Sequence, residues 1–187
     1  NQQTTGAGIR SKKYCTNFAI NNKVFGATID AQQHNRGELW CATLWDMTWN
    51  IINQVDSINP NLYDTSSSGG NAIALKLVTL GMKLQPCSPG FIDGRDAILQ
   101  ADEILYNGAH GCAIREAFRR RGMGAFASQG SSGSVTDQTA DFNLASAKLE
   151  MTQSTPEVME GNEVTYNNKL TAGPRAAITN FLLTDTL

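Results

Sequence analysis

His34, at the start of a predicted helix, is the residue of this sequence best suited to chemistry. An imidazole can donate a hydrogen bond to an oxygen that gains negative charge, or shuttle a proton near neutral pH. Asp30 lies close upstream and could orient the ring, whereas Glu38 falls on the first turns of the helix, where the helix dipole favours a carboxylate. Composition alone favours a plainer interpretation, with His34 an ordinary histidine and Asp30 a turn or N-cap residue.

Complete catalytic motifs are missing from the sequence. A zinc hydrolase typically carries His-Glu-x-x-His on a helix, with two imidazoles for the metal and a glutamate that activates water. This sequence has only two histidines, His34 and His110, and neither belongs to such a motif. The Gly-x-Ser-x-Gly turn of serine hydrolases and the glycine-rich nucleotide loops are missing as well. The motifs therefore predict no metal site in this chain and no self-sufficient enzyme.

The four cysteines, Cys15, Cys41, Cys87 and Cys112, leave two interpretations open. No two of them form Cys-x-x-Cys, which argues against a zinc ribbon or a thioredoxin-like motif. An even number allows three ways of forming two disulfides, which would indicate an exported protein. The alternative is four free thiols in a cytosolic helical domain of unknown role.

The amino-acid composition limits the classes of function that this chain can have. The chain has 187 residues, of which 41% are hydrophobic and 17% are charged, so it can bury a core. A formal net charge of −2 gives no bulk attraction for nucleic acid. No apolar run approaches the ~20 residues of a membrane span. The polar start, without an initiator methionine or a signal sequence, indicates a piece of a longer protein.

The first part of the chain is predicted to be helical. The predicted helices cover residues 33–55, 71–83, 88 onward and 113–121. The first is apolar over most of its circumference, including Trp45 and Trp49, and is expected to be central. The third is expected to begin with Ser88 as N-cap and Pro89 as its first helical residue. Arg119–Arg121 end the fourth, where cations suit the negative end of the helix dipole.

The last part of the chain changes in character. A small polar run predicts a linker, placed at residues 127–147. Short runs that mix apolar residues with Thr and Asn, around 164–170 and 178–183, predict β-strands. Residues 148–187 are too few for a complete β-sandwich, so an incomplete one is expected. The prediction is a mainly α-helical fold over residues 1–143 with a short β-rich tail.

Four stretches of the sequence carry a family resemblance. They are residues 33–45, 71–91, 94–102 and 111–124. The first contains His34-x-x-Gly37-Glu38-x-Trp40. In this order the stretches resemble the fungalysin family, secreted zinc metallopeptidases of fungi and bacteria that share the active-site plan of thermolysin. The resemblance covers about residues 6–143.

The resemblance implies a specific role for this chain. In fungalysins the zinc-binding helix and a third ligand, a glutamate, lie upstream of the matched region. The chain would then be the C-terminal helical subdomain of the catalytic domain, forming one wall of the cleft. His34 would stabilise the oxyanion of the tetrahedral intermediate, Asp30 would orient it, and Arg10 would contact substrate. Zinc is expected in the parent enzyme and not in this chain alone. The implied partners are the upstream zinc-binding part and a peptide or protein substrate.

The resemblance also bears on the cysteines. Cys87 and Cys112 match a cysteine pair of the family, which implies a disulfide that ties the start of the third helix to the fourth. Cys15 and Cys41 stand where small residues are common in the family. These two unusual cysteines are therefore expected to pair with each other, provided that their Cα atoms lie within about 4.4–6.8 Å.

The tail, residues 160–187, resembles the opening of a bacterial extracellular immunoglobulin-like repeat, a module that commonly follows secreted catalytic domains. The absence of an Asn-x-Ser/Thr sequon fits a bacterial source. The leading hypothesis is a fragment of a secreted zinc metalloendopeptidase, a hydrolase of peptide bonds that is inactive as this chain alone. The alternative is a non-catalytic extracellular module that binds protein or polysaccharide.

Overall fold

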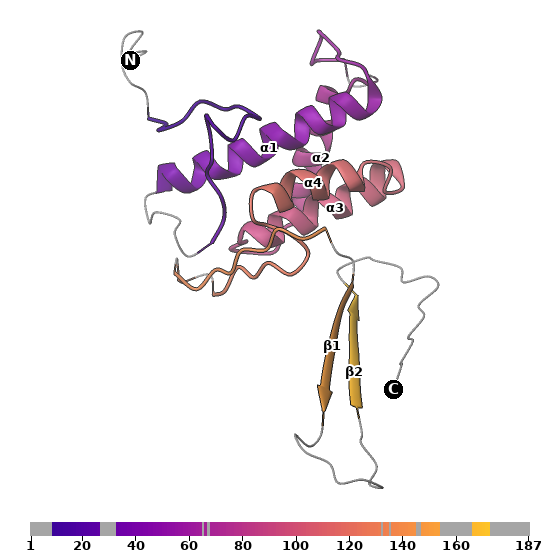
Figure 1. Ribbon diagram of the computed structural model, residues 1–187. Helices are drawn as coiled ribbons and strands as arrows, with labels where there is room; N and C mark the ends of the chain where they lie inside the picture. The colour runs from indigo at the N-terminus through magenta and orange to yellow at the C-terminus, as the bar shows by residue number, and fades with distance from the viewer. Residues whose placement is uncertain are drawn as a thin grey trace, which may run out of the picture. The chain divides into compact units, whose positions relative to one another are not determined.

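The computed structural model of this chain divides into two compact units, residues 1–144 and 145–187 (Figure 1). The structure describes residues 9–26, 33–64, 66, 68–131, 133–134 and 136–144, and the backbone of 147–153 and 166–172. Asp30 and most of the predicted immunoglobulin-like tail lie outside these ranges. Within them, none of the helices combines the length and the apolar character that crossing a membrane requires.

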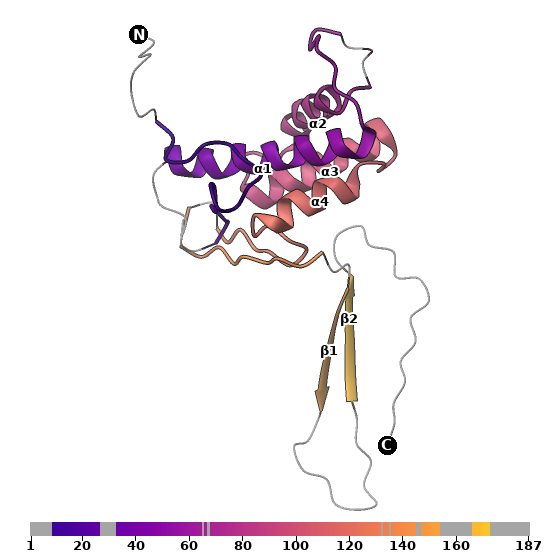
Figure 2. The same cartoon turned by 45° about the horizontal axis from the view of Figure 1, so that its top comes forward.

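The first unit is mainly helical, as predicted. Its helices are α1 (Gln33–Val55), α2 (Gly70–Leu84), α3 (Phe91–Tyr106) and α4 (Gly111–Arg120). Both α2 and α4 pack against α1, and α3 packs against α2 (Figure 2). Glycine permits the closest of these contacts, since a Cβ added at Gly70 would lie 2.5 Å from the Cα of Ile52. The helix α1 thus takes the central place that its apolar pattern predicts.

The core lies between α1 and the helices around it. Its aliphatic and aromatic side chains include Leu39, Met47, Ile51, Leu77, Ile98, Ile114 and Phe118. Burying each such side chain stabilises the fold by about 1.5–3 kcal/mol. The expectation that Trp45 and Trp49 share in this burial is wrong. Their rings contact each other at 6.2 Å, and they are 41% and 36% exposed. Thr43 and Asp46 occupy buried positions of α1 instead.

The start of α3 differs from the prediction. Ser88 is not the N-cap, because its φ is +54° and the cap residue is Gly90. Side chains bind the N–H groups at this end. Ile92 and Asp93 donate to Gln129 Oε1 at 2.9 and 3.1 Å, and Gly90 donates to Asp93 Oδ2 at 2.9 Å. Gln129 belongs to the polar run predicted as a linker, so this part of the run lies in the first unit and caps one of its helices.

The second unit is described over two antiparallel strands, β1 (Ala147–Gln153) and β2 (Tyr166–Ala172). The strand β2 overlaps the predicted run at 164–170, whereas 178–183 lies outside the described residues. Sequence patterns did not predict β1, because Ala, Lys, Leu, Glu, Met and Gln all favour helices when taken singly. Pairing with β2 over seven residues outweighs that local preference.

Candidate functional site

The candidate site lies at the N-terminal end of α1. His34 is the second residue of this helix, and it is exposed. Arg10 approaches from the segment before the helix. Its Nη1 donates to the carbonyl oxygen of His34 at 2.5 Å, and its guanidinium packs against Gly37 one turn later. The structure therefore brings together His34 and Arg10, two of the three residues predicted for the site. Asp30 lies outside the described residues, and its role stays a prediction.

A buried carboxylate fixes this arrangement. Glu38 is fully buried and accepts hydrogen bonds from the backbone N–H groups of Ser11 and Lys12 at 3.1 and 2.5 Å. The ammonium of Lys23 lies 3.2 Å from Glu38 Oε2. Glu38 lies on the first turns of α1, as expected, but it is in the second turn, because α1 has no acidic residue in its first turn. Glu38 holds the segment that carries Arg10 against α1.

Opposing effects set the pKa of Glu38. Burial raises it, but the backbone hydrogen bonds from Ser11 and Lys12 and the contact with Lys23 lower it more, so it lies below its usual value of 4.5 in the folded protein. Folding therefore favours the ionised carboxylate. The stabilisation is fully present above the usual pKa and is lost as the pH falls through the lower folded-state pKa.

Acid unfolding should reveal this carboxylate. We expect Glu38→Gln to lower Tm at neutral pH and to make Tm less sensitive to pH in the acid range, because the variant has no proton to bind at this position. Circular dichroism melts across that range measure both effects. Glu116→Gln, which changes a half-exposed carboxylate, is the matched control. An acid dependence identical in Glu38→Gln and the unchanged chain would contradict the prediction.

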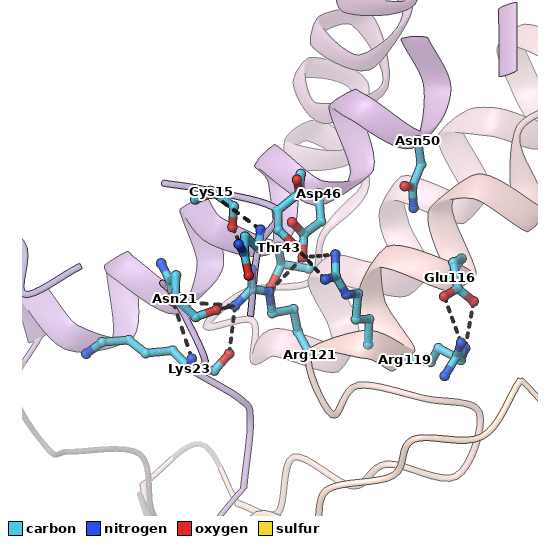
Figure 3. Close-up of polar contacts among 12 residues, drawn as sticks. Cys15, Asn21, Lys23, Thr43, Asp46, Asn50, Glu116, Arg119 and Arg121 are labelled. Carbon is cyan, nitrogen blue, oxygen red and sulfur yellow. Dashed lines mark hydrogen bonds and ion pairs between the residues drawn. The ribbon is translucent and has the colours of Figure 1, made fainter. Parts of the chain in front are cut away.

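A second polar cluster links α1 to the end of α4. Arg121 is fully buried, and its Nε lies 2.7 Å from Oδ2 of Asp46, which is 1% exposed. The same guanidinium donates to the carbonyl oxygens of Cys15, Asn21 and Lys23 at 3.3, 2.8 and 3.1 Å (Figure 3). Arg121 thus anchors the later part of the N-terminal segment, whose earlier part runs beside the start of α1.

The consecutive arginines at this point have different roles. Arg119 forms an ion pair with Glu116 at 2.6 Å, as expected of a residue in the exposed last turn of a helix. Arg121 lies instead over the ring of Phe18, at 4.6 Å from the centroid, and binds Asp46. The interpretation of the whole cluster as a dipole partner is therefore wrong for Arg121. The signal that could have found this pair is Asp46, an acidic residue within the predicted apolar helix.

The two histidines lie far apart. His110 is buried, with its Nδ1 3.0 Å from Gln54 Oε1 and its ring against Tyr106. About 30 Å of helix separates Gln54 from His34 along α1. Among the described residues, no group of three or more His, Cys, Asp or Glu side chains could hold a metal ion. This donor set does not fit a zinc site, and no catalytic step is assigned to a metal held by it.

All four cysteines are described, and all are free thiols in the structure. Cys87 precedes α3 and Cys112 follows it, and both are exposed. The structure does not contain the Cys87–Cys112 bond that the resemblance implies, and this pairing stays a prediction. Cys15 and Cys41 are half-buried, and their pairing stays a prediction.

Thiol titration separates these possibilities. In the denatured, unreduced chain we expect no reactive thiol, because both predicted pairs are oxidised, and four after reduction. Alkylation followed by peptide mapping assigns each thiol to its residue. Four thiols before reduction would contradict both pairs. Two thiols before reduction that map to one predicted pair would contradict that pair alone.

The sequence is similar to proteins that are already known. The family model described as fungalysin metallopeptidase (M36) matches residues 1–127. The chain is 38% identical over 123 residues to extracellular metalloproteinase 2 of Trichophyton tonsurans, a match that covers 63% of this chain and 19% of that protein. It is 38% identical over 126 residues to extracellular metalloproteinase 4 of Arthroderma benhamiae, with the same shares covered. The chain thus spans about a fifth of the length of these relatives.

The residues covered by these matches, and the organisms of the relatives, determine which predictions they support. The relatives are fungal, so they lend no support to the predicted bacterial source. The family match ends before residue 145, where the second unit begins, so the predicted immunoglobulin-like repeat gains no support from it. Over the helical unit, by contrast, the match covers more than half of the whole chain. This protein therefore belongs to the fungalysin metallopeptidase (M36) family.

Proposed function

We propose that this chain is the C-terminal helical part of a secreted zinc metalloendopeptidase and forms one wall of its active-site cleft. The observation that carries the proposal is the exposed His34, held by Arg10 at the start of α1, in a member of a metallopeptidase family. The relatives are named extracellular metalloproteinases, which supports secretion and the hydrolysis of peptide bonds. Zinc would be held by an upstream part of the complete protein.

His34 is assigned to stabilise charge on the substrate. When water adds to a peptide carbonyl, the oxygen gains negative charge, and a positioned hydrogen-bond donor lowers the energy of that state. The side chain of His34 is exposed, and its backbone carbonyl is bound by Arg10. The backbone is thus held in place while the ring is open to contact with substrate. Arg10 is proposed to contact substrate from the same place, and Asp30 to orient the imidazole.

Activity of the complete protein tests this proposal. We expect the complete gene product to hydrolyse casein, and the zinc chelator 1,10-phenanthroline to abolish the hydrolysis. The 187-residue chain alone should cleave nothing, because its described residues do not fit a metal site. If the complete protein shows no chelator-sensitive hydrolysis, the proposal fails. The alternative, a non-catalytic extracellular module that binds protein or polysaccharide, would then be tested by binding assays.

A further inference from the structure

The outer side of α1 exposes two neighbouring tryptophans. All three tryptophans of the chain belong to α1. Trp40 packs within the helical unit, and its ring lies 5.7 Å from those of Phe91 and Phe118, measured between centroids. Trp45 and Trp49 lie 6.2 Å apart, edge to face, and are 41% and 36% exposed. Exposed aromatic side chains that gather on a surface typically mark a place where another part of a protein packs.

These two tryptophans lie on the same face of α1 as His34. Successive residues of a helix are turned by about 100°, so Trp45 lies about 20° and Trp49 about 60° around α1 from His34. Along the helix axis they lie about 17 and about 23 Å from His34. A small domain, about 30 Å across, that reaches His34 along this face therefore extends over both tryptophans.

Tyr14 connects the tryptophans to the candidate site. It is 37% exposed and lies beside the side chains of Arg10 and Cys41. Cys41 precedes Trp45 by four residues, so the two are neighbours on the helix surface. The exposed aromatic side chains thus form a row that starts beside Arg10 and ends at Trp49. We name Tyr14, Trp45 and Trp49 the aromatic face.

The charged side chains of α1 are buried or lie away from the aromatic face. They are Arg36, Glu38 and Asp46, of which Glu38 and Asp46 are buried. Arg36 lies about 200° around α1 from His34, on the opposite side of the helix. The cores of protein interfaces are poor in charged residues and rich in Trp and Tyr. The aromatic face therefore suits a partner surface of aliphatic and aromatic side chains.

The proposed function identifies the partner. The chain spans about a fifth of the length of its relatives, and no group of its described residues fits a metal site. A peptide that contacts both His34 and the upstream zinc-binding part leaves only its own thickness between them. We infer that this upstream part of the complete protein packs on the aromatic face. The identity of the partner rests on the proposed function, whereas the need for an apolar partner rests on the exposed side chains.

Oxidative footprinting of the complete protein and of the 187-residue chain tests this inference. Hydroxyl radicals oxidise exposed tryptophans, and mass spectrometry of the peptides gives a rate for each tryptophan of α1. We expect Trp45 and Trp49 to be oxidised several-fold more slowly in the complete protein, because the upstream part covers them. Trp40 is the internal control and should react alike in both, because its neighbours belong to the helical unit. Equal rates for Trp45 and Trp49 in the two proteins would overturn the inference.

The complete protein decides alone if the 187-residue chain does not fold, since Trp45 and Trp49 should react there no faster than Trp40. Other occupants of the aromatic face give different patterns. A second copy of the protein would protect the two tryptophans only at high protein concentration, and substrate would protect them only when casein is added. Either pattern would assign the face to that occupant and overturn the inference.

Paired substitutions separate an interface from a role inside the helical unit. Trp45→Gln/Trp49→Gln should lower the Tm of the complete protein by several degrees and that of the 187-residue chain much less, since exposed side chains contribute little within the unit. Ile104→Gln/Leu105→Gln, which changes two exposed apolar side chains of α3, is the matched control and should leave both Tm values nearly unchanged. Equal losses from the tryptophan variant in the two proteins would overturn the inference.

The proposed function and this inference can fail separately. A complete protein without peptidase activity that still protects both tryptophans would refute the proposed function and keep the interface. An active peptidase with reactive tryptophans would keep the proposed function and refute the interface.

Discussion

Replacing His34 by alanine in the complete peptidase is expected to lower kcat by about 100- to 1,000-fold, with a far smaller change in KM. This is the effect of removing one donor that acts on charge present in the transition state and not in the bound substrate. The substitution removes the ring and keeps the backbone carbonyl that Arg10 binds, so the end of α1 should stay in place. Initial rates on a quenched fluorescent peptide give kcat and KM separately.

Gln33→Ala is the matched control, since Gln33 is the preceding residue of α1 and is also exposed. Its kcat should be that of the unchanged enzyme. An equal loss in both variants would indicate damage to the helix end and not the loss of an imidazole. Unchanged kcat in His34→Ala would return His34 to the role of an ordinary surface histidine and would remove the main residue of the proposed site.

Arg121→Met is expected to lower the free energy of unfolding by about 3–5 kcal/mol, because it leaves the carboxylate of Asp46 buried without its partner. The compensation that remains is partial. Asp46 Oδ1 has no hydrogen-bond partner in the described part of the chain, and Arg120 Nη1, 3.8 Å from Oδ2, forms an ion pair without a hydrogen bond. Chemical denaturation of the 187-residue chain measures the loss.

Two further variants show whether the burial of the Arg121–Asp46 ion pair causes the loss of stability in Arg121→Met. Arg119→Met breaks a pair whose side chains are 33% and 39% exposed, and should cost at most about 1 kcal/mol. The double variant Asp46→Leu/Arg121→Met buries no charge and should regain much of the stability that Arg121→Met loses. If Arg119→Met destabilised the chain as much as Arg121→Met, the buried pair would not be the reason for the effect.

The helices could be predicted because their signals are local. Apolar spacing gave 33–55 for α1, which the structure bounds at Gln33–Val55. Hydropathy alone cannot tell which apolar side chains will pack against others. The exposure of Trp45 and Trp49 could therefore not be predicted from it. The contacts that fix the helix ends could also not be predicted from the sequence. Gln129 binds the N–H groups of α3 from 36 and 37 residues away, and no local pattern encodes such a distance.

The candidate site was predictable only in part. His34 stood out from the sequence alone, but its proposed role, and the choice of Arg10, came from a family resemblance. The role of Glu38 was hidden, because an acid near a helix start is usually explained by the helix dipole. Its actual partners, Ser11 and Lys12, are backbone donors 27 and 26 residues away, and a sequence pattern carries no sign of them.

The position of Arg121 has a consequence for the order of folding. Its guanidinium closes a loop of 100 residues to Asn21, and long loops are closed late because their closure costs the most chain entropy. The segment that carries Arg10 is synthesised before the helices, yet its later part gains its anchor only when α4 is complete. A nascent chain that ends before Arg121 would therefore hold the segment of Arg10 against α1 through Glu38, without the second anchor that Arg121 gives to the later part of that segment. The proposed catalytic surface is among the first parts of this unit to be made, and the segment beside it is fully anchored only when the last helix is complete.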